Sequence, residues 1–311
     1  MSRSLPARIL LSPNEPRLRA GWRLLGHTLL ILGIALLFSL PGGLLFLQRG
    51  LMLDSNAGQL YFGVVQAISI VLATLIARRL LDRRSIPSLG LRIDRHTLRD
   101  YAFGFALGGV LMGGIFLIFL MFGWLQIRNY AWQGARPSAW LLPLGGWLLI
   151  FVAVGFYEEL LSRGYHLQNL AEGLNLPLGL FLSSASFAAL HLGNPHATWI
   201  STLGILAAGF FLAYPWLRTR QLWLSFGLHA GWNFFQGQVF GFPVSGTESF
   251  HLIRHTISGP PIITGGAFGP EAGLIVLAAM LFGAGLIFFY TRGRILNANG
   301  ANTCPGRRCR G

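Results

Sequence analysis

Charged residues are scarce in this 311-residue chain. Only 11% of its residues are charged and 53% are hydrophobic, with a mean hydropathy of +0.56, whereas soluble domains carry about 25% charged residues. This composition excludes an ordinary water-soluble globule. Lysine is missing, so all 24 basic residues are arginine, and the only cysteines are Cys304 and Cys309. Two cysteines exclude a disulfide framework and supply at most half of a zinc site.

Apolar runs of membrane-spanning length recur along the whole chain. A helix needs about 20 apolar residues to cross a bilayer, and eight segments approach that length. They are residues 24–47, 58–77, 101–125, 140–157, 176–192, 197–217, 222–240 and 272–290. The sequence therefore predicts an all-α fold, a polytopic membrane bundle of about eight transmembrane helices.

The arginines are distributed unevenly between the two sides of this predicted bundle. If the amino terminus is cytoplasmic, 20 of the 24 arginines fall in cytoplasmic segments, and the other four are Arg49, Arg128, Arg136 and Arg254. Cytoplasmic loops of membrane proteins are enriched in basic residues. The asymmetry predicts a multi-pass protein of the plasma (inner) membrane with both termini cytoplasmic. It also explains the net charge of +14 without a nucleic-acid partner.

The first of three polar clusters follows the apolar run that ends at Tyr157. Ionisable residues within membrane spans are costly to bury and usually mark function. Glu159 and Arg163 are spaced i, i+4, which allows an ion pair on a helix, while Glu158 points about 100° away from Glu159. Glu158 is therefore left available for chemistry. The alternative interpretation is a helix end that emerges among lipid headgroups, where carboxylates are ordinary.

Two further polar clusters lie in the spans that follow. His191 ends one apolar run, and His229 and Asn233 share one face of another helix because they are spaced i, i+4. A helical hairpin with its tip at 173–175 would place Glu158 and His191 at the same height. This requires the Glu158 helix to continue beyond the predicted end of its span. The alternative for these side chains is hydrogen bonding between neighbouring helices.

This set of residue types suits hydrolysis of a peptide bond. Such a reaction needs a base that takes a proton from water, a donor to the oxyanion and exclusion of bulk solvent. Glu158 is a candidate base, and histidine and asparagine side chains can donate hydrogen bonds. The same residues also allow a metal site, because Glu158, His191 and His229 are acceptable ligands and leave one position open for water.

The three clusters resemble the E-E-x-x-x-R, F-x-x-x-H and H-x-x-x-N motifs of the CaaX protease and bacteriocin-processing family. This family of intramembrane endopeptidases includes the type II CaaX prenyl proteases, and the resemblance covers about residues 140–240. It implies a catalytic set of Glu158, Glu159, Arg163, His191, His229 and Asn233. In this set the first glutamate activates water, and the second glutamate and the arginine hold its helix and local field. The histidines align the water or stabilise the transition state, and the asparagine donates to the oxyanion.

The apolar runs, the arginine distribution and the resemblance together divide the chain into regions. They are a basic cytoplasmic segment (1–23), three transmembrane helices (24–125) with a basic cytoplasmic linker (78–100), a CaaX-protease-like core (140–240), an outer loop (241–270), a last transmembrane helix (271–290) and a basic cytoplasmic tail (291–311). His251 and His255 form a second i, i+4 pair, which we interpret as part of a solvated loop.

The resemblance leaves open both the mechanism and the function class. Glu158, His191 and His229 could hold a divalent metal such as zinc, although an H-E-x-x-H motif is absent, or Glu158 could act without a metal. The expected partners are membrane lipid and a peptide or membrane-protein substrate. One alternative is a catalytically silent scaffold or bacteriocin-immunity-type protein of the same fold. Another is a transporter, because buried glutamate and histidine also serve as proton relays.

Overall fold

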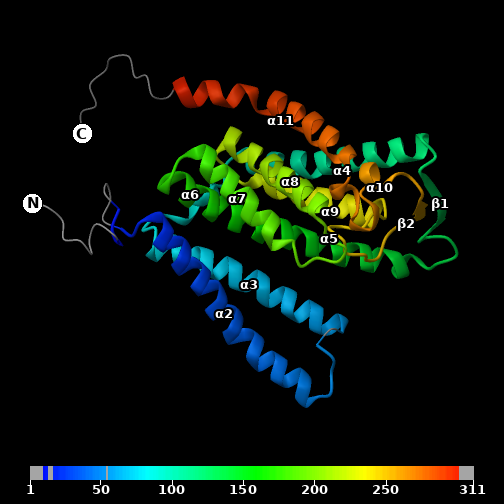
Figure 1. Ribbon diagram of the computed structural model, residues 1–311, viewed down its shortest axis with the longest axis horizontal. Coiled ribbons are helices and arrows are strands. Elements are labelled where there is room, and N and C mark those ends of the chain that lie inside the picture. The colour runs from blue at the N-terminus through cyan, green and yellow to red at the C-terminus, as the bar shows by residue number, and fades with distance from the viewer. Residues whose placement is uncertain (1–9, 13–16, 54, 301–311) are drawn as a thin grey trace, which may run out of the picture.

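The protein is a bundle of helices, in agreement with the predicted all-α fold (Figure 1). The computed structural model describes residues 10–12, 17–53 and 55–300, so the tail with Cys304 and Cys309 lies outside the described residues. The longer helices are α2 (Ala20–Gln48), α3 (Asn56–Leu80), α4 (Thr97–Met121), α5 (Pro137–Glu159), α8 (Trp199–Thr219) and α11 (Leu274–Gly300). The shorter helices are α6 (Leu167–Gly173), α7 (Leu176–Leu190), α9 (Trp223–Phe234) and α10 (Pro261–Thr264).

Two stretches of wider π-helix continue these helices on either side of the predicted site. The segment η2 (Leu160–His166) joins α5 to α6, and η3 (Phe235–Val239) continues α9. Such π segments inside α-helices are rare and frequently occur at functional sites. Three short 3₁₀ segments are η1 (Ile86–Leu89), η4 (Gly266–Phe268) and η5 (Pro270–Ala272).

Each predicted span overlaps helical structure, but the count of eight spans is not confirmed. Six helices among the described residues are long and apolar enough to cross a membrane. One of them runs without interruption through α5, η2 and α6 over 37 residues. In contrast, α7 has 15 residues and α9 has 12. Hydropathy identified α9 as a span because a short helix buried inside a bundle is as apolar as one that faces lipid.

The predicted hairpin tip between the first two polar clusters is confirmed. The long helix ends at Gly173, and α7 begins at Leu176 after an asparagine cap. The Asn175 side chain accepts a hydrogen bond from the Leu178 amide at 2.9 Å, which satisfies one of the unpaired amides at a helix start. The antiparallel pairing brings the middle of the long helix beside the end of α7.

Helix α9 packs closely against α4 because both helices carry glycines at their contact. A Cβ atom at Gly231 would lie 2.2 Å from the Phe105 carbonyl oxygen, and one at Gly108 would lie 2.3 Å from the Trp232 nitrogen. Gly104 and Gly227 make equally close approaches. The spacing G-x-x-x-G occurs in both helices and lets membrane helices approach at backbone distance. This packing fixes the helix that carries the third polar cluster.

Strand pairing links two distant segments at one end of the bundle. Strand β1 (Leu125–Tyr130) pairs antiparallel with β2 (Ile253–Ile257), with Leu125 opposite Ile257. This pair was not predicted, because β1 follows a predicted span and β2 lies in the predicted outer loop. Within β2, His255 is partly buried, and its Nε2 donates to the Phe240 carbonyl at 2.8 Å. The expectation of a solvated loop is therefore wrong for this side chain.

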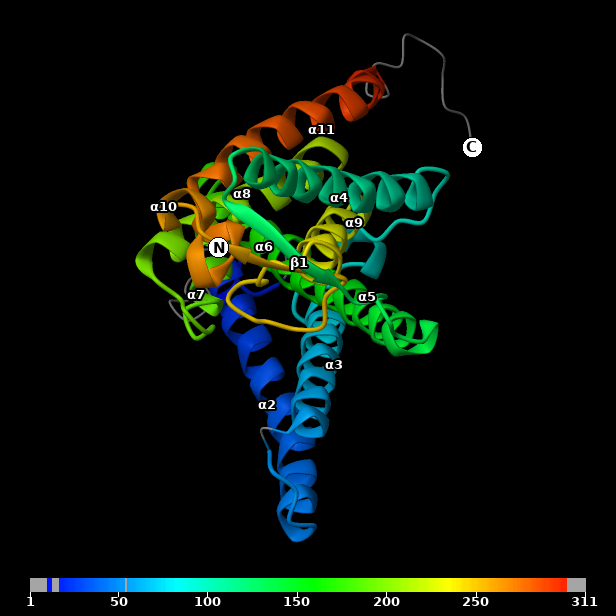
Figure 2. The ribbon, with the colours of Figure 1, turned by 90° about the vertical axis from the view of Figure 1, so that its right-hand side faces the viewer.

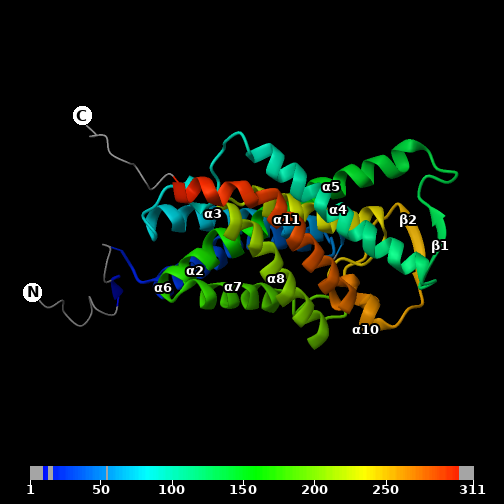
Figure 3. The same ribbon diagram turned by 90° about the horizontal axis from the view of Figure 1, so that it is seen from above.

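Helices α2 and α3 form a hairpin that stands apart from the other helices along much of its length, as Figure 2 shows. Only 6% of the most apolar window of α2 is buried, which suits a helix whose surroundings are lipid. Seen from above, the start of α2 and the end of α11 lie at the same end of the molecule (Figure 3). This is also the end where the hairpin joins the remaining helices.

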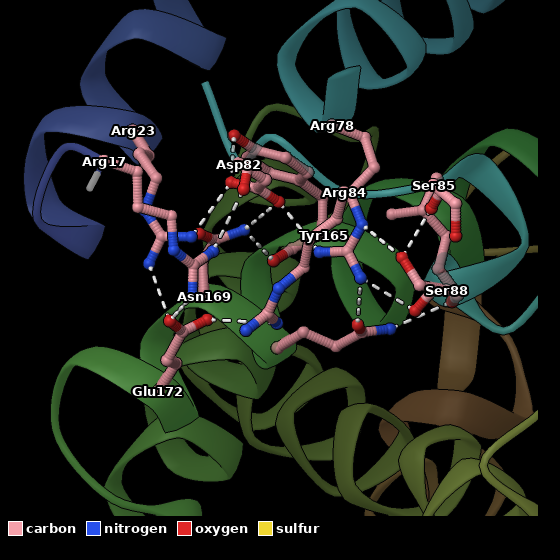
Figure 4. Close-up of polar contacts among 12 residues, drawn as sticks. Arg17, Arg23, Arg78, Asp82, Arg84, Ser85, Ser88, Tyr165, Asn169 and Glu172 are labelled. Atoms are coloured by element: carbon pink, nitrogen blue, oxygen red, sulfur yellow. Dashed lines mark hydrogen bonds and ion pairs between the residues drawn. The ribbon is translucent and has the colours of Figure 1, made fainter. Parts of the chain in front are cut away.

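A buried network of charges joins the hairpin to the long helix (Figure 4). Asp82 lies just after α3 and its side chain is fully buried. Its oxygens pair with Arg23 of α2 at 3.0 Å and Arg78 of α3 at 2.8 Å. They also accept hydrogen bonds from the Tyr165 hydroxyl at 3.3 Å and the Asn169 amide at 3.4 Å. We call these five residues the Asp82 cluster.

A second carboxylate extends this network toward the turn between α6 and α7. Glu172 forms ion pairs with Arg17, with Arg23 at 3.4 Å and with Arg84 at 3.3 Å. The basic segment that follows α3 is therefore partly a structural element in which arginines are paired, rather than a purely solvated linker.

Candidate active site

The first predicted motif forms the buried ion pair that its spacing allows. Arg163 Nη1 lies 2.8 Å from Glu159 Oε1, and both side chains are almost completely buried. Arg163 Nη2 donates to the Gly209 carbonyl of α8 at 2.8 Å, and the guanidinium lies 4.5 Å from the centre of the Phe187 ring. Because Arg163 binds α8 and stacks on α7, the ion pair ties three helices together.

Glu159 also binds the third motif. His229 Nδ1 donates to Glu159 Oε1 at 2.9 Å, which orients the imidazole and leaves Nε2 on its opposite side. A carboxylate on one ring nitrogen increases the basicity of the other nitrogen and stabilises the protonated ring. Glu159 therefore fixes the orientation of His229.

Glu158 points into a cavity instead of the helix interface, as the 100° rotation predicts. Its Oε2 lies 4.0 Å from His191 Nε2 and 3.8 Å from His229 Nε2. This oxygen is buried and has no hydrogen-bond partner among the described residues. The separations are too long for direct hydrogen bonds, and a water molecule placed between these groups would bridge them. The structure thus brings residues from all three motifs to one point.

The second motif sets the orientation of His191. Its Nδ1 lies 2.8 Å from the Phe187 carbonyl oxygen, which can only accept, so Nδ1 carries a proton and Nε2 faces Glu158. The Phe187 side chain is buried beside this ring, with the two ring centres 4.7 Å apart. In a neutral His191 the Nε2 lone pair is directed at the position where a water molecule would bind.

The cavity has a volume of about 240 Å³ and is lined by both polar and apolar side chains. Asn233 is one of the polar lining residues and makes no side-chain hydrogen bond with another described residue, so its amide is available to a bound group. The apolar lining includes Phe151 and Val154 of α5 and Leu212 of α8. His251 and His255 do not line this cavity.

A second, larger groove also includes Glu158 and His191 in its lining and is mainly apolar. It has a volume of about 680 Å³ and runs between the α2–α3 hairpin and the long helix. Its lining includes Ile31 of α2, Val65 of α3 and Leu161 of η2, and it ends at Glu158 and His191. The site is therefore connected to the apolar surroundings of the hairpin.

The arrangement does not match a metal centre. No group of three or more His, Cys, Asp or Glu side chains in the described part of the chain is placed to hold a metal ion. Two atoms bound to one tetrahedral zinc ion at about 2.1 Å would lie about 3.4 Å apart, whereas Glu158 lies 4.0 and 3.8 Å from the two imidazoles. These side-chain positions fit a water molecule better than zinc.

Sequence reasoning missed one acidic residue of the cavity. Glu271 of η5 lines the same cavity, and it is 4% exposed. Burial raises the pKa of Glu271 above its usual range, and hydrogen bonds from Ser245 oppose this shift. The residue follows Gly269 and Pro270 in a segment that we expected to lie outside the core, and only the three-dimensional fold brings it to the site.

The fold is that of a polytopic membrane protein, and glutamate and histidine side chains from three helices meet in a cavity inside it. Residues 139–235 match the family described as Type II CAAX prenyl endopeptidase Rce1-like. The matched segment is about a third of the chain and contains all three motifs. It confirms the resemblance, because this segment is similar to the type II CAAX prenyl endopeptidases. No curated protein and no solved structure matches the chain.

Proposed function

We propose that this protein is an intramembrane endopeptidase in which Glu158 activates water. The observation that carries the proposal is the buried Glu158 Oε2, which has no hydrogen-bond partner among the described residues and faces two imidazole nitrogens. A buried acceptor without a partner is costly. A bound water satisfies Glu158 and is at the same time the nucleophile.

The reaction proceeds by transfer of one proton through Glu158. The Glu158 carboxylate takes a proton from water as the oxygen attacks the carbonyl carbon of the scissile peptide bond. The same carboxyl group then gives the proton to the leaving amine when the C–N bond breaks. The products are a carboxylic acid and an amine, which become a carboxylate and an ammonium ion when one proton passes between them, and the glutamate returns to its starting state.

The neighbouring side chains hold the water and stabilise the charge that develops. His191 Nε2 orients the attacking water. His229, with Glu159 on its Nδ1, donates from a protonated Nε2 to the oxyanion, and the Asn233 amide is a second donor. Fixed donors in an enclosed site contribute more than they would in water.

The substrate we infer is a peptide segment that is membrane-associated or lipid-linked. The apolar groove beside α2 and α3 would accommodate the hydrophobic part of such a substrate. The polar side chains that line the cavity would face the peptide backbone. The arginine asymmetry supports cleavage near the cytoplasmic leaflet of the plasma (inner) membrane, with both termini cytoplasmic.

We propose the metal-free form of this mechanism. The alternative form has a zinc ion held by Glu158, His191 and His229. It would require these side chains to lie closer together than they do in the structure. Activity in isolated membranes is therefore expected to survive a strong chelator of divalent metals. Inactivation by the chelator that is reversed only by added zinc would support the metal site instead.

The experiment that tests the function is a comparison of protein termini by mass spectrometry. Membranes of a deletion strain would be complemented with wild type, Glu158→Ala or Glu248→Ala at matched expression. Glu248 is an exposed glutamate that does not line the cavity. New termini in wild type and Glu248→Ala that disappear in Glu158→Ala would establish proteolysis and name the substrate. Identical profiles in a strain whose phenotype Glu158→Ala still rescues would favour the scaffold.

A further inference from the structure

A segment beyond the matched family region closes one side of the active-site cavity. Ser245, Thr247 and Glu271 line this cavity together with His191 and Asn194. The first three residues follow residue 235, where the family match ends, and the proposed chemistry gives them no role. A buried carboxylate at the wall of an active site calls for a physical account.

The Glu271 carboxylate is bound to a turn whose residues line the same cavity as Glu158. Its Oε2 accepts a hydrogen bond from the Ser245 amide at 2.6 Å and another from the Ser245 hydroxyl at 3.1 Å. Hydrogen bonds to a carboxylate are stronger than those between neutral groups. Ser245 has a positive φ of 46°, a conformation that a non-glycine residue keeps only when its surroundings hold it.

The same turn is connected to the segment that carries His191. The Asn194 side-chain amide donates to the Ser245 carbonyl at 3.1 Å, and the Asn194 backbone amide donates to the His191 carbonyl at 3.1 Å. A Cβ atom at Gly246 would lie 1.8 Å from the Pro195 carbonyl oxygen. The turn at Ser245 and Gly246 therefore lies directly against the chain that follows His191.

The backbone of Glu271 packs against helix α8. Helix α8 approaches so closely that a Cβ atom at Gly204 would lie 1.9 Å from the Glu271 carbonyl oxygen. The Gly246 amide donates to the Phe268 carbonyl at 2.8 Å, which adds a second link between the turn and the segment before Glu271. The contacts form a continuous path from α8 to His191.

We propose that Glu271 is a positioning residue of the active site, which fixes the His191 segment through Ser245 and Asn194. Its catalytic consequence rests on the proposed function, because the link controls the gap between His191 and Glu158 that holds the nucleophilic water. We call the path Glu271–Ser245–Asn194 the Glu271 link. Proximity effects are sensitive to displacements of about 1 Å, which can cost about a hundredfold in rate.

The first test measures the link without reference to activity. Hydrogen exchange of the full-length protein in lipid nanodiscs would be compared for wild type, Glu271→Ala, Glu271→Gln and the control Glu248→Ala. In Glu271→Ala the amides of Gly246 and Asn194 are expected to exchange at least about tenfold faster. Glu271→Gln keeps an acceptor for Ser245, so its exchange stays within about threefold of wild type. Exchange in α9 stays unchanged.

The second test measures the catalytic consequence in the same variants. The Glu158-dependent termini are expected to fall about tenfold in Glu271→Ala and to remain near wild type in Glu271→Gln and Glu248→Ala. Asn194→Ala removes the other end of the Glu271 link. Combined with Glu271→Ala, it should lower cleavage by less than about twofold further, because both changes break one path.

Several results would overturn the proposal. Unchanged exchange at Gly246 and Asn194 in Glu271→Ala would show that there is no link. Faster exchange with unchanged cleavage would remove the positioning role, and a Glu271→Gln variant as impaired as Glu271→Ala would show that charge matters instead. If Glu271→Ala unfolds as a whole, Asn194→Ala decides. Wild type without Glu158-dependent termini would refute the proposed function, while hydrogen exchange would still test the link.

Discussion

Two carboxylates among the helices, the fully buried Asp82 and the partly buried Glu158, differ in how their oxygens are satisfied. Both oxygens of Asp82 have partners, from Arg23, Arg78 and two neutral donors. Glu158 has a buried oxygen without a hydrogen-bond partner among the described residues, although two imidazoles face it. The first group holds helices together, and the second remains available to a water molecule.

This difference separates Asp82, which has a structural role, from Glu158, the proposed catalytic base. A buried charge whose partners are complete stabilises only the arrangement that supplies them, and loss of one partner leaves the others unpaired. A buried acceptor without partners reduces stability and is retained where chemistry needs it.

Breaking the Asp82 cluster should have the largest effect on stability. Asp82→Ala leaves the buried Arg78 without its carboxylate and leaves Arg23 with Glu172 alone, which should cost about 3–5 kcal/mol. Thermal unfolding of the purified protein would measure this loss. The exposed Asp94, whose carboxylate accepts one hydrogen bond from the His96 amide, provides the control, and Asp94→Ala should cost less than about 1 kcal/mol. Equal effects of the two variants would refute the structural role of the Asp82 cluster.

A change remote from any charge should damage the Glu158 site through packing. Gly231→Ala places a Cβ atom 2.2 Å from the Phe105 carbonyl oxygen, which forces α4 and α9 apart and displaces His229. We expect a stability loss of about 1–3 kcal/mol and a strong reduction of Glu158-dependent cleavage. Gly114→Ala is the matched control in α4, because no atom lies within 4 Å of its Cβ. A fully active Gly231→Ala variant would contradict the packing argument.

Removing the charge of Glu159 should lower Glu158-dependent cleavage if His229 acts as a cation. Glu159→Gln keeps the size of the side chain but removes the charge that supports a protonated His229. Loss of such a supporting carboxylate typically costs 10–100-fold, so Glu158-dependent termini should fall by about that factor. Quantitative mass spectrometry of the termini would measure this. Unchanged cleavage would show that His229 does not act as a cation.

A smaller effect, on the pH dependence of stability, is expected at the His255 ring. This residue lies far from Asp82 and Glu158 in sequence. Burial lowers the pKa of His255 from its ordinary value of 6.5, and the nearby His251 lowers it further. The folded state thus favours the neutral ring, and the associated stability is present above pH 6.5 and decreases as the pH falls through the lowered pKa. His255→Gln should flatten the loss of thermal stability between pH 7.5 and 5. The exposed His196 is the control, and an equal flattening in His196→Asn would argue against His255.

Local patterns in the sequence were enough to predict the helices and the core of the site. The i, i+4 spacing of Glu159 and Arg163 predicted their ion pair, and the hairpin tip correctly placed Glu158 opposite His191. The G-x-x-x-G spacings of α4 and α9 were also visible, but two such spacings do not reveal which helices meet. Short-range periodicity determines the face of a helix that each residue occupies, and it carries no information on partners.

Long-range contacts could not be predicted in this way. The pairing of β1 with β2 joins segments more than 120 residues apart, and Glu271 reaches the site only because α8 and the Ser245 turn hold it there. Asp82 was one of several acids in a segment that appeared basic and solvated. Its burial depends on arginines contributed by two different helices.

The most direct measurement compares Glu158→Gln with Asp82→Asn in thermal unfolding and in Glu158-dependent cleavage. Glu158→Gln should abolish cleavage and leave the unfolding temperature equal to or above that of wild type, because it removes a buried charge that lacks hydrogen-bond partners. Asp82→Asn should lower the unfolding temperature strongly, and the protein that remains folded should still cleave. A Glu158→Gln variant that cleaves normally, or that loses as much stability as Asp82→Asn, would contradict the distinction between the two carboxylates.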